Sequence, residues 1–155
     1  MKAVMPGSFD PFTLGHWDIV TRAARLFSEV IIAVGANDAK QCHFPIQTRL
    51  AMAQACAQSL DNVQVAIMSG LLVDFCRDHD AMVAVRGARS GSDFEAESAM
   101  ALMNADLGAI ETVILPASSA VGFISSTLVR SILRAGGDAY GYVPEPVAQM
   151  MQKEL

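Results

Sequence analysis

Short runs of apolar, mostly β-branched residues alternate along this chain with longer segments in which apolar residues recur at three- and four-residue spacing. The short runs are largely continuous rather than alternating with polar residues, which is typical of strands covered on both faces. They lie at residues 3–5, 30–34, 63–67, 82–85 and 112–115. The longer segments have helical periodicity and lie at residues 17–27, 46–57, 72–76, 94–103, 126–135 and 146–155.

This alternation of strands and helices predicts an α/β fold built from right-handed βαβ units. We expect a Rossmann-like, doubly wound parallel sheet of five strands with helices on both faces, formed by a single domain over residues 1–155. Open sheets of this kind bind ligands beyond the carboxyl ends of their strands. The positions at which functional residues are expected therefore follow Met5, Val34, Ile67, Val85 and Leu115.

Composition excludes several classes of protein. Apolar residues make up 52% of the 155 residues and charged residues only 17%, which argues against a disordered chain. The formal net charge of −5 disfavours general binding to nucleic acids or to anionic membrane surfaces. An anionic ligand therefore has to be held by a local cluster of basic groups.

The cysteine pattern predicts reduced thiols. Cys42, Cys56 and Cys76 are an odd number without CxxC spacing, so we expect neither a disulfide framework nor a zinc site. The apolar segment at the N-terminus is too short for a signal peptide, and no apolar run approaches the roughly 18 residues that span a bilayer. We expect a soluble, cytoplasmic protein with no membrane or nucleic-acid partner.

A candidate anion site follows the first strand, in the sequence PGSFDPFTLGH at residues 6–16. Gly7 allows a ligand to approach the backbone closely, and Ser8 adds a hydroxyl donor. Thr13 suits the N-cap of the first helix, which would place His16 at the third helical position. Backbone N–H groups and the positive end of the helix dipole would bind a phosphate there, with the His16 imidazole pointing at it.

Two further clusters follow the fourth and fifth strands. Ser125–Thr127 supplies three hydroxyls at the start of a predicted helix, suited to phosphate oxygens, although one of them would suffice as an N-cap. Arg86 and Arg89 leave the end of a buried strand, where an arginine is costly unless it meets an anion. Ion pairs with Asp93 or Glu95 are the alternative, and we favour a bound anion.

These motifs resemble a known enzyme family. GSFDPFTLGH at residues 7–16 resembles the (H/T)xGH signature of the nucleotidylyltransferase superfamily, and ISSTLVR at residues 124–130 resembles its ISSTxxR motif. With RGAR at residues 86–89 and DFEAE at residues 93–97, the chain is most similar to the bacterial phosphopantetheine adenylyltransferases. Thr13 takes the place in which many superfamily members carry a first His, and Ser8 replaces the Thr usual in this family. The similarity runs nearly from end to end.

The resemblance implies a role for each motif residue. The catalytic residues it implies are Ser8, His16, Lys40 and Arg89. The acceptor-binding residues it implies are Ser8, Lys40, Leu72 and Arg86. The ATP-binding residues it implies are Ser8, Phe9, His16, Gly87, Ala88, Arg89, Glu97, Val121, Gly122, Phe123, Ile124, Ser125, Ser126 and Thr127. From the residues alone, Leu72 could equally belong to the core, and Arg130 could face either the site or the solvent.

The resemblance also implies the reaction, which is adenylyl transfer from ATP to 4′-phosphopantetheine, giving dephospho-coenzyme A and pyrophosphate. A phosphomonoester dianion is already a competent nucleophile, so we expect direct in-line attack without a covalent enzyme intermediate. No dedicated metal site is visible, and Mg²⁺ is expected to arrive with ATP. The family further implies a homohexamer. The alternatives are a related enzyme with another phosphate acceptor, such as nicotinate mononucleotide, and a non-catalytic nucleotide-binding domain.

Overall fold

The structure is a computed structural model that describes residues 1–36 and 41–154. Its strands are β1 (Lys2–Gly7), β2 (Glu29–Gly35), β3 (Val63–Met68), β4 (Val83–Ala88) and β5 (Glu111–Pro116). Its helices are α1 (Leu14–Leu26), α2 (Ile46–Ala57), α3 (Leu72–Asp78), α4 (Gly91–Gly108), α5 (Ser126–Arg134) and α6 (Glu145–Glu154), with a 3₁₀ turn η1 (Tyr140–Tyr142). Within the described ranges, no helix combines the length and the apolar character needed to cross a bilayer.

The strands form a five-stranded parallel sheet in the order β3-β2-β1-β4-β5. This arrangement confirms the predicted α/β class and parallel topology. The chain builds outward from β1 through β2 to β3 and then returns to place β4 on the other side of β1. The topological switch point therefore lies between β1 and β4, where open sheets of this kind have their ligand crevice.

Apolar side chains of the sheet pack into two clusters, one on each face. Val30, Ile32 and Val34 of β2 belong to the larger cluster, which also contains buried residues of α1, α2, α5 and α6. Ile31 and Ala33, at the intervening positions, belong to the second cluster with buried residues of α3. Because successive strand residues point to opposite faces and both faces are covered, β2 is continuously apolar from Val30 to Val34.

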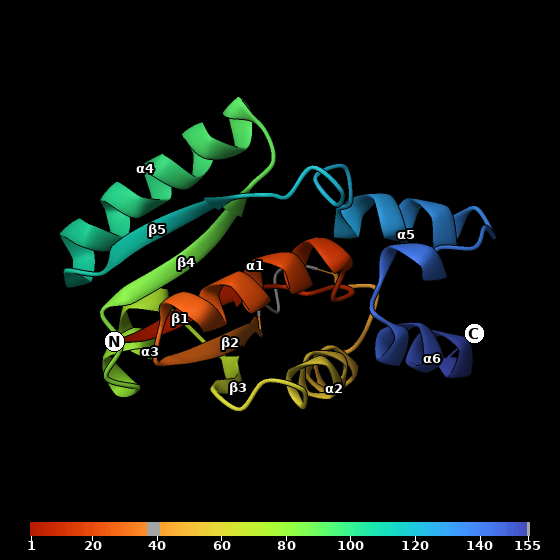
Figure 1. Cartoon of the computed structure of the whole chain (residues 1–155), viewed down its shortest axis with the longest axis horizontal. Helices are drawn as coiled ribbons and strands as arrows, with labels where there is room; N and C mark the ends of the chain where they lie inside the picture. Colours follow the sequence, from red (N-terminus) through yellow and green to blue (C-terminus); the bar gives the residue numbers. More distant parts are fainter. Residues whose placement is uncertain (37–40, 155) are drawn as a thin grey trace.

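Helices cover the faces of the sheet, and loops lie at the carboxyl ends of its strands. In Figure 1, α4 runs alongside β4 and β5, whereas α5 and α6 lie beyond the carboxyl ends of the strands. The chain leaves β5 at this end and crosses to α5 through residues 117–125. The loops that follow β1, β4 and β5 therefore face a common region.

The elements β4 and α4 extend beyond the ranges predicted from the sequence. The predicted fourth strand stops at Val85 because an arginine ends the apolar run, but β4 continues to Ala88, with Arg86 and Gly87 paired to Ile114 and Leu115 of β5. The fourth helix starts at Gly91 and runs to Gly108, longer at both ends than its apolar periodicity suggested. Backbone pairing continues past the end of each hydrophobic pattern, so apolar patterning alone underestimated both elements.

Candidate active site

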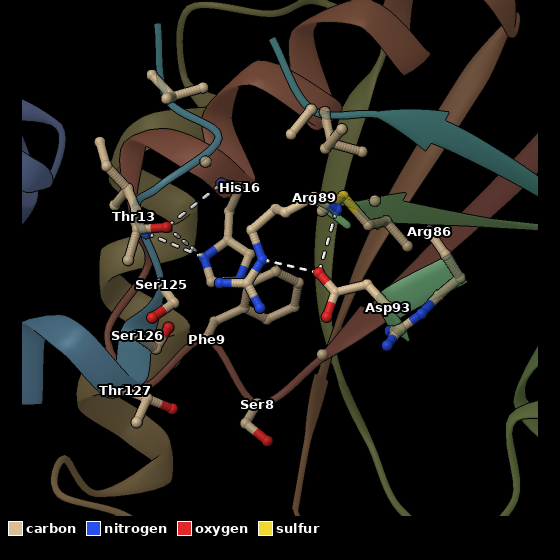
Figure 2. Close-up of a pocket in the computed structure, with 18 of the residues that line it drawn as sticks. Ser8, Phe9, Thr13, His16, Arg86, Arg89, Asp93, Ser125, Ser126 and Thr127 are labelled. Carbon is tan, nitrogen blue, oxygen red and sulfur yellow. Dashed lines mark hydrogen bonds and ion pairs between the residues drawn. The ribbon is translucent and has the colours of Figure 1, made fainter. Parts of the chain in front are cut away.

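A cavity of about 350 Å³ opens at the switch point between β1 and β4 (Figure 2). It is lined by the end of β1 and the turn after it, the first turns of α1, the end of β4, the first turns of α4, and residues between β5 and the start of α5. The three motif-bearing loops therefore meet around one space, as the rule for open parallel sheets requires.

His16 enters the cavity through a capping box at the start of α1. Thr13 is the N-cap, as predicted, and its Oγ1 accepts from the His16 backbone N–H at 3.4 Å. The Thr13 backbone N–H donates to Nδ1 of His16 at 3.0 Å (dashed in Figure 2). Because a backbone N–H can only donate, Nδ1 must be unprotonated, and the neutral ring carries its proton on Nε2.

The surroundings of His16 keep it neutral. Burial, with the positive charges of Arg86 and Arg89, lowers the pKa of His16 to about 4. Its ring packs edge-on against Phe9, with ring centroids 4.9 Å apart, and lies 5.5 Å from the ring of Phe12. At neutral pH this side chain is therefore a fixed hydrogen-bond donor through Nε2, and it is unsuited to be a general acid.

Arg86 and Arg89, two of the three arginines that line the cavity, are held by carboxylates. Arg86 forms a bidentate pair with Glu97, Nε to Oε2 and Nη2 to Oε1, each 2.7 Å long, and its Nη1 donates to the Pro6 carbonyl. Arg89 donates to Asp93 Oδ2 from Nε at 3.0 Å and from its backbone N–H at 3.1 Å (Figure 2). The ion-pair alternative, which the sequence argument gave less weight, is thus present for Arg89 with Asp93.

These ion pairs lie on the cavity wall rather than away from it. Arg86, Arg89, Asp93 and Glu97 all line the cavity. The backbone N–H of Arg89 holds the pKa of Asp93 below its ordinary value against the opposing effect of burial, with help from the Arg89 guanidinium. An incoming phosphate can therefore reach both guanidinium groups, where it competes with the carboxylates for their N–H donors.

The hydroxyls at the start of α5 already have protein partners. Ser125 is the N-cap and its Oγ accepts from the Leu128 N–H at 3.1 Å, which is the simple capping role that sequence left open. Ser126 donates to the Pro11 carbonyl at 2.9 Å, and Thr127 Oγ1 accepts from Arg130 at 3.3 Å. Since the first N–H groups of a helix lack intrahelical partners, α5 offers backbone donors and its dipole to a ligand here.

The connection between β5 and α5 is fastened to α1 by Asp18. Its carboxylate accepts from the Ser118 N–H at 3.1 Å and from the Ser118 hydroxyl at 2.5 Å, and it pairs with Arg22 at 3.0 Å. Burial alone would raise the pKa of Asp18, but the hydrogen bonds from Ser118 and Arg22 outweigh it and lower the pKa. The loop is therefore held in place by a charged anchor that the sequence argument missed.

Two glycines permit close packing around the cavity. A Cβ on Gly15 would lie 3.2 Å from the Ile124 carbonyl, so a side chain there would push the 117–125 connection away from α1. A Cβ on Gly87 would lie 2.9 Å from Cγ1 of Ile19, which fixes how closely α1 approaches β4. At both positions, the missing side chain lets the elements that form the cavity walls pack closely.

The cavity brings together most of the residues predicted for it. The predicted residues that line it are Ser8, Phe9, His16, Arg86, Gly87, Arg89, Glu97, Val121, Ile124, Ser125, Ser126 and Thr127. Outside the lining set, Leu72 packs against the second core cluster, and Phe123 is exposed with its ring edge-on to Tyr142. Ala88 and Gly122 are also outside the set. Lys40 lies outside the described residues.

Two further charged residues that were not identified from sequence support the site, together with Arg130, which lines the cavity. Asp10 and Arg49 are almost completely buried, with 4% and 3% of their surface exposed. Arg130, whose direction sequence left open, donates from Nη1 to the Asp10 carbonyl at 2.7 Å. In the sequence, Arg49 is a charged residue on the apolar face of a predicted helix. Apolar periodicity assigns that face to the core and does not single out a charged residue on it.

Comparisons with known proteins agree with this geometry. The model of a family described as cytidylyltransferase-like matches residues 4–132. A phosphopantetheine adenylyltransferase of Nocardioides sp. is 46% identical over 99% of this chain and 97% of its own length. That of Thermotoga neapolitana is 40% identical over 100% of this chain and 97% of its own. A Vibrio parahaemolyticus crystal structure described as a nicotinate-nucleotide adenylyltransferase superposes with a TM-score of 0.73 at 18% identity, covering 99% of this chain and 92% of that one, a likeness of fold.

Proposed function

Because the chain belongs to the cytidylyltransferase-like family and to the phosphopantetheine adenylyltransferases, we propose that its cavity transfers the adenylyl group of ATP to 4′-phosphopantetheine. The chain is a nucleotidyltransferase of coenzyme A biosynthesis. The products are dephospho-coenzyme A and pyrophosphate. An oxygen of the acceptor phosphate attacks the α-phosphorus of ATP, and the bond to the β-phosphate breaks as pyrophosphate leaves.

One observation carries the mechanism, which is the neutral His16 donor fixed beside two guanidinium groups and a helix N-terminus in one cavity. Charge accumulates on the α-phosphate oxygens in the transition state, and preorganised donors stabilise that charge without having to reorient. A phosphomonoester has a second pKa of about 6, so the acceptor is largely a dianion at neutral pH and needs no base. His16 therefore stabilises charge rather than transferring a proton.

For the other side chains that line the cavity, we propose the roles that the family resemblance implies. Ser8 and His16 bind the α-phosphate, and Arg86 at the end of β4 anchors the acceptor phosphate. Arg89 and the N-terminus of α5 at Ser125–Thr127 hold the nucleotide and the departing pyrophosphate. Orientation of the attacking phosphate by Lys40 stays a sequence-based prediction, as does pantetheine binding by Leu72.

We propose that Mg²⁺ enters as a complex with ATP. Among the residues that the structure describes, no group of three His, Cys, Asp or Glu side chains is arranged to hold a metal ion. Both cavity carboxylates, Asp93 and Glu97, are engaged by arginines. The described side chains do not form a protein cage for magnesium. Bound to the nucleotide, the cation would neutralise phosphate charge, and water molecules would supply its remaining ligands.

The exposed face of α4 supports assembly with further copies of the chain. Asn104 is buried, whereas large apolar side chains along the described helix are exposed. They are Phe94 (54%), Met100 (57%), Leu102 (75%), Met103 (54%) and Leu107 (52%). Exposed apolar patches of this kind mark association surfaces. We propose that this face is covered in the homohexamer that the family resemblance implies. Light scattering should give about six times 16.5 kDa, and a monomer would contradict this.

The decisive assay for the function measures pyrophosphate release. Purified protein is incubated with ATP, Mg²⁺ and one acceptor at a time, either 4′-phosphopantetheine or nicotinate mononucleotide. Release with 4′-phosphopantetheine alone supports the proposal. Release with nicotinate mononucleotide instead would assign another acceptor, and release with neither would favour a nucleotide-binding domain without catalysis. A cytoplasmic location stays the prediction made from the sequence.

A further inference from the structure

Arg49 is a buried cation beneath the first loop of the site. It lies on α2 with 3% of its surface exposed, and its partners come from three separate segments. Nη1 donates to the Ser8 carbonyl at 2.6 Å and to the Gly35 carbonyl at 3.0 Å, and Nε donates to the Phe44 carbonyl at 3.1 Å. One guanidinium thus joins the turn after β1, the end of β2 and the start of α2.

This arrangement is costly if its only purpose is stability. A buried charge loses its hydration, and well-packed apolar side chains often serve a core as well or better. Among the described residues, the hydrogen bonds of Arg49 go to backbone carbonyls, which orient the guanidinium but carry no full negative charge. A planar fork with several donors in fixed directions is, however, suited to holding three chain segments at one relative position.

The turn that Arg49 holds is strained and lies directly in the cavity. Phe9 has a φ of +48°, in the left-handed region that a bulky side chain rarely adopts. Such a conformation persists only when its surroundings impose it, and it is concentrated at functional sites. Ser8 precedes Phe9 and lines the cavity together with His16. The contact to the Ser8 carbonyl therefore fixes the strained turn from one side.

Asp10 fixes the same turn from the other side. Its buried carboxylate accepts from the His43 N–H at Oδ2 and from the Phe44 N–H at Oδ1, each at 2.8 Å. Arg130 of α5 donates to the Asp10 carbonyl. Phe44 is thus bound through its carbonyl by Arg49 and through its N–H by Asp10. The strained residue lies between two anchored neighbours.

We propose that Arg49, with Asp10, is a positioning residue for adenylyl transfer: it holds the Ser8–Asp10 turn so that Ser8 and His16 meet the same phosphate. This inference rests on the proposed function. Arg49 does not line the cavity, and it acts through the backbone of Ser8. A misplacement of about 1 Å far from the reacting atoms can cost roughly 10²-fold in rate.

The test compares Arg49→Lys with a variant that destabilises the same helix without touching the turn. Arg49→Lys keeps the charge but loses the planar fork. Met52→Ala, one turn along α2, removes a fully buried core side chain and leaves the carbonyl contacts in place. Pyrophosphate release is measured with both substrates saturating and at a temperature well below both melting points. We expect Arg49→Lys to lower kcat by about 10²-fold with either KM changed less than about fivefold.

A kcat of Arg49→Lys within about threefold of wild type, or an equal loss in Met52→Ala, would overturn the inference. If Arg49→Lys does not fold, Asp10→Asn is judged by the same two criteria. Amide spectra of the unliganded protein give a readout that needs no activity: Arg49→Lys should shift the Ser8 and Phe9 resonances. Unmoved Ser8 and Phe9 resonances would refute the inference, whereas an inactive wild-type protein would refute the proposed function alone.

Discussion

Replacing His16 by Gln separates the two tasks that the structure gives to this side chain. His16 accepts the Thr13 N–H in a capping box, and it presents Nε2–H to the cavity. Glutamine is a common third residue of capping boxes because its side-chain oxygen reaches back to the N-cap N–H. His16→Gln should therefore keep the cap and lose the imidazole donor, whereas His16→Ala loses both.

The expected magnitudes differ between the two variants. Loss of one preorganised donor to a transition-state oxyanion costs about 10²–10³ in kcat, and we expect this loss in both. Loss of a cap costs about 1 kcal/mol of stability, so His16→Ala should unfold at lower urea concentration than His16→Gln. The assays are pyrophosphate release with both substrates saturating and urea unfolding at pH 7.5. A kcat of His16→Gln within a few-fold of wild type would remove His16 from the transition state.

The low pKa of His16 makes stability depend on pH. The group has a pKa of about 4 when folded against 6.5 as its ordinary value, so between these limits the unfolded chain binds more protons. Stability from His16 is therefore complete above pH 6.5 and is lost as the pH falls toward 4. Between pH 7.5 and pH 5 the loss is about 2 kcal/mol. His16→Gln should lack this part of the pH dependence, and an identical pH dependence in both proteins would refute the assigned pKa.

Three other substitutions test separate parts of the structure. Arg86→Gln should raise the KM for 4′-phosphopantetheine by about tenfold or more, as expected for a lost charged hydrogen bond, and an equal rise in the KM for ATP would contradict an acceptor role. Asp18→Asn should raise the KM for ATP and cost about 1–2 kcal/mol in urea unfolding at pH 7. That contribution is present above the ordinary pKa of Asp18 of 3.8 and is lost as the pH falls through the lowered one, so the two proteins should converge in strong acid. Thr112→Val should be neutral or stabilise by about 1 kcal/mol, because the Thr112 hydroxyl is buried without a hydrogen-bond partner among the described residues.

The fold could be predicted from the sequence because its main signals are local. Continuous apolar runs marked all five strands of the sheet, and the Thr13 cap marked the start of α1. The rule for parallel sheets then placed the cavity before any side chain was positioned. The sequence prediction underestimated a strand where its apolar pattern ended. Arg86 ended the predicted fourth strand, although backbone pairing continues to Ala88.

The supporting residues of the site could not be predicted because their partners are distant in sequence. Asp18 meets Ser118, and Arg49 meets the carbonyl of Ser8, through contacts that only the folded chain creates. The pairing of Arg86 with Glu97 is of the same kind, since an arginine and a glutamate separated by a strand end and a helix start carry no local signature. Sequence indicated which groups could bind phosphate, whereas the structure shows what occupies them.

The carboxylates paired with Arg86 and Arg89 limit how tightly the enzyme can bind a phosphate group. Where a ligand oxygen displaces Glu97 or Asp93 from its arginine, the net free energy gained is only the difference between two charge-assisted contacts. Glu97 and Asp93 can pair with their arginines again once the new bond has formed. We expect this competition to weaken product affinity and to speed the departure of pyrophosphate, favouring repeated cycles over tight capture.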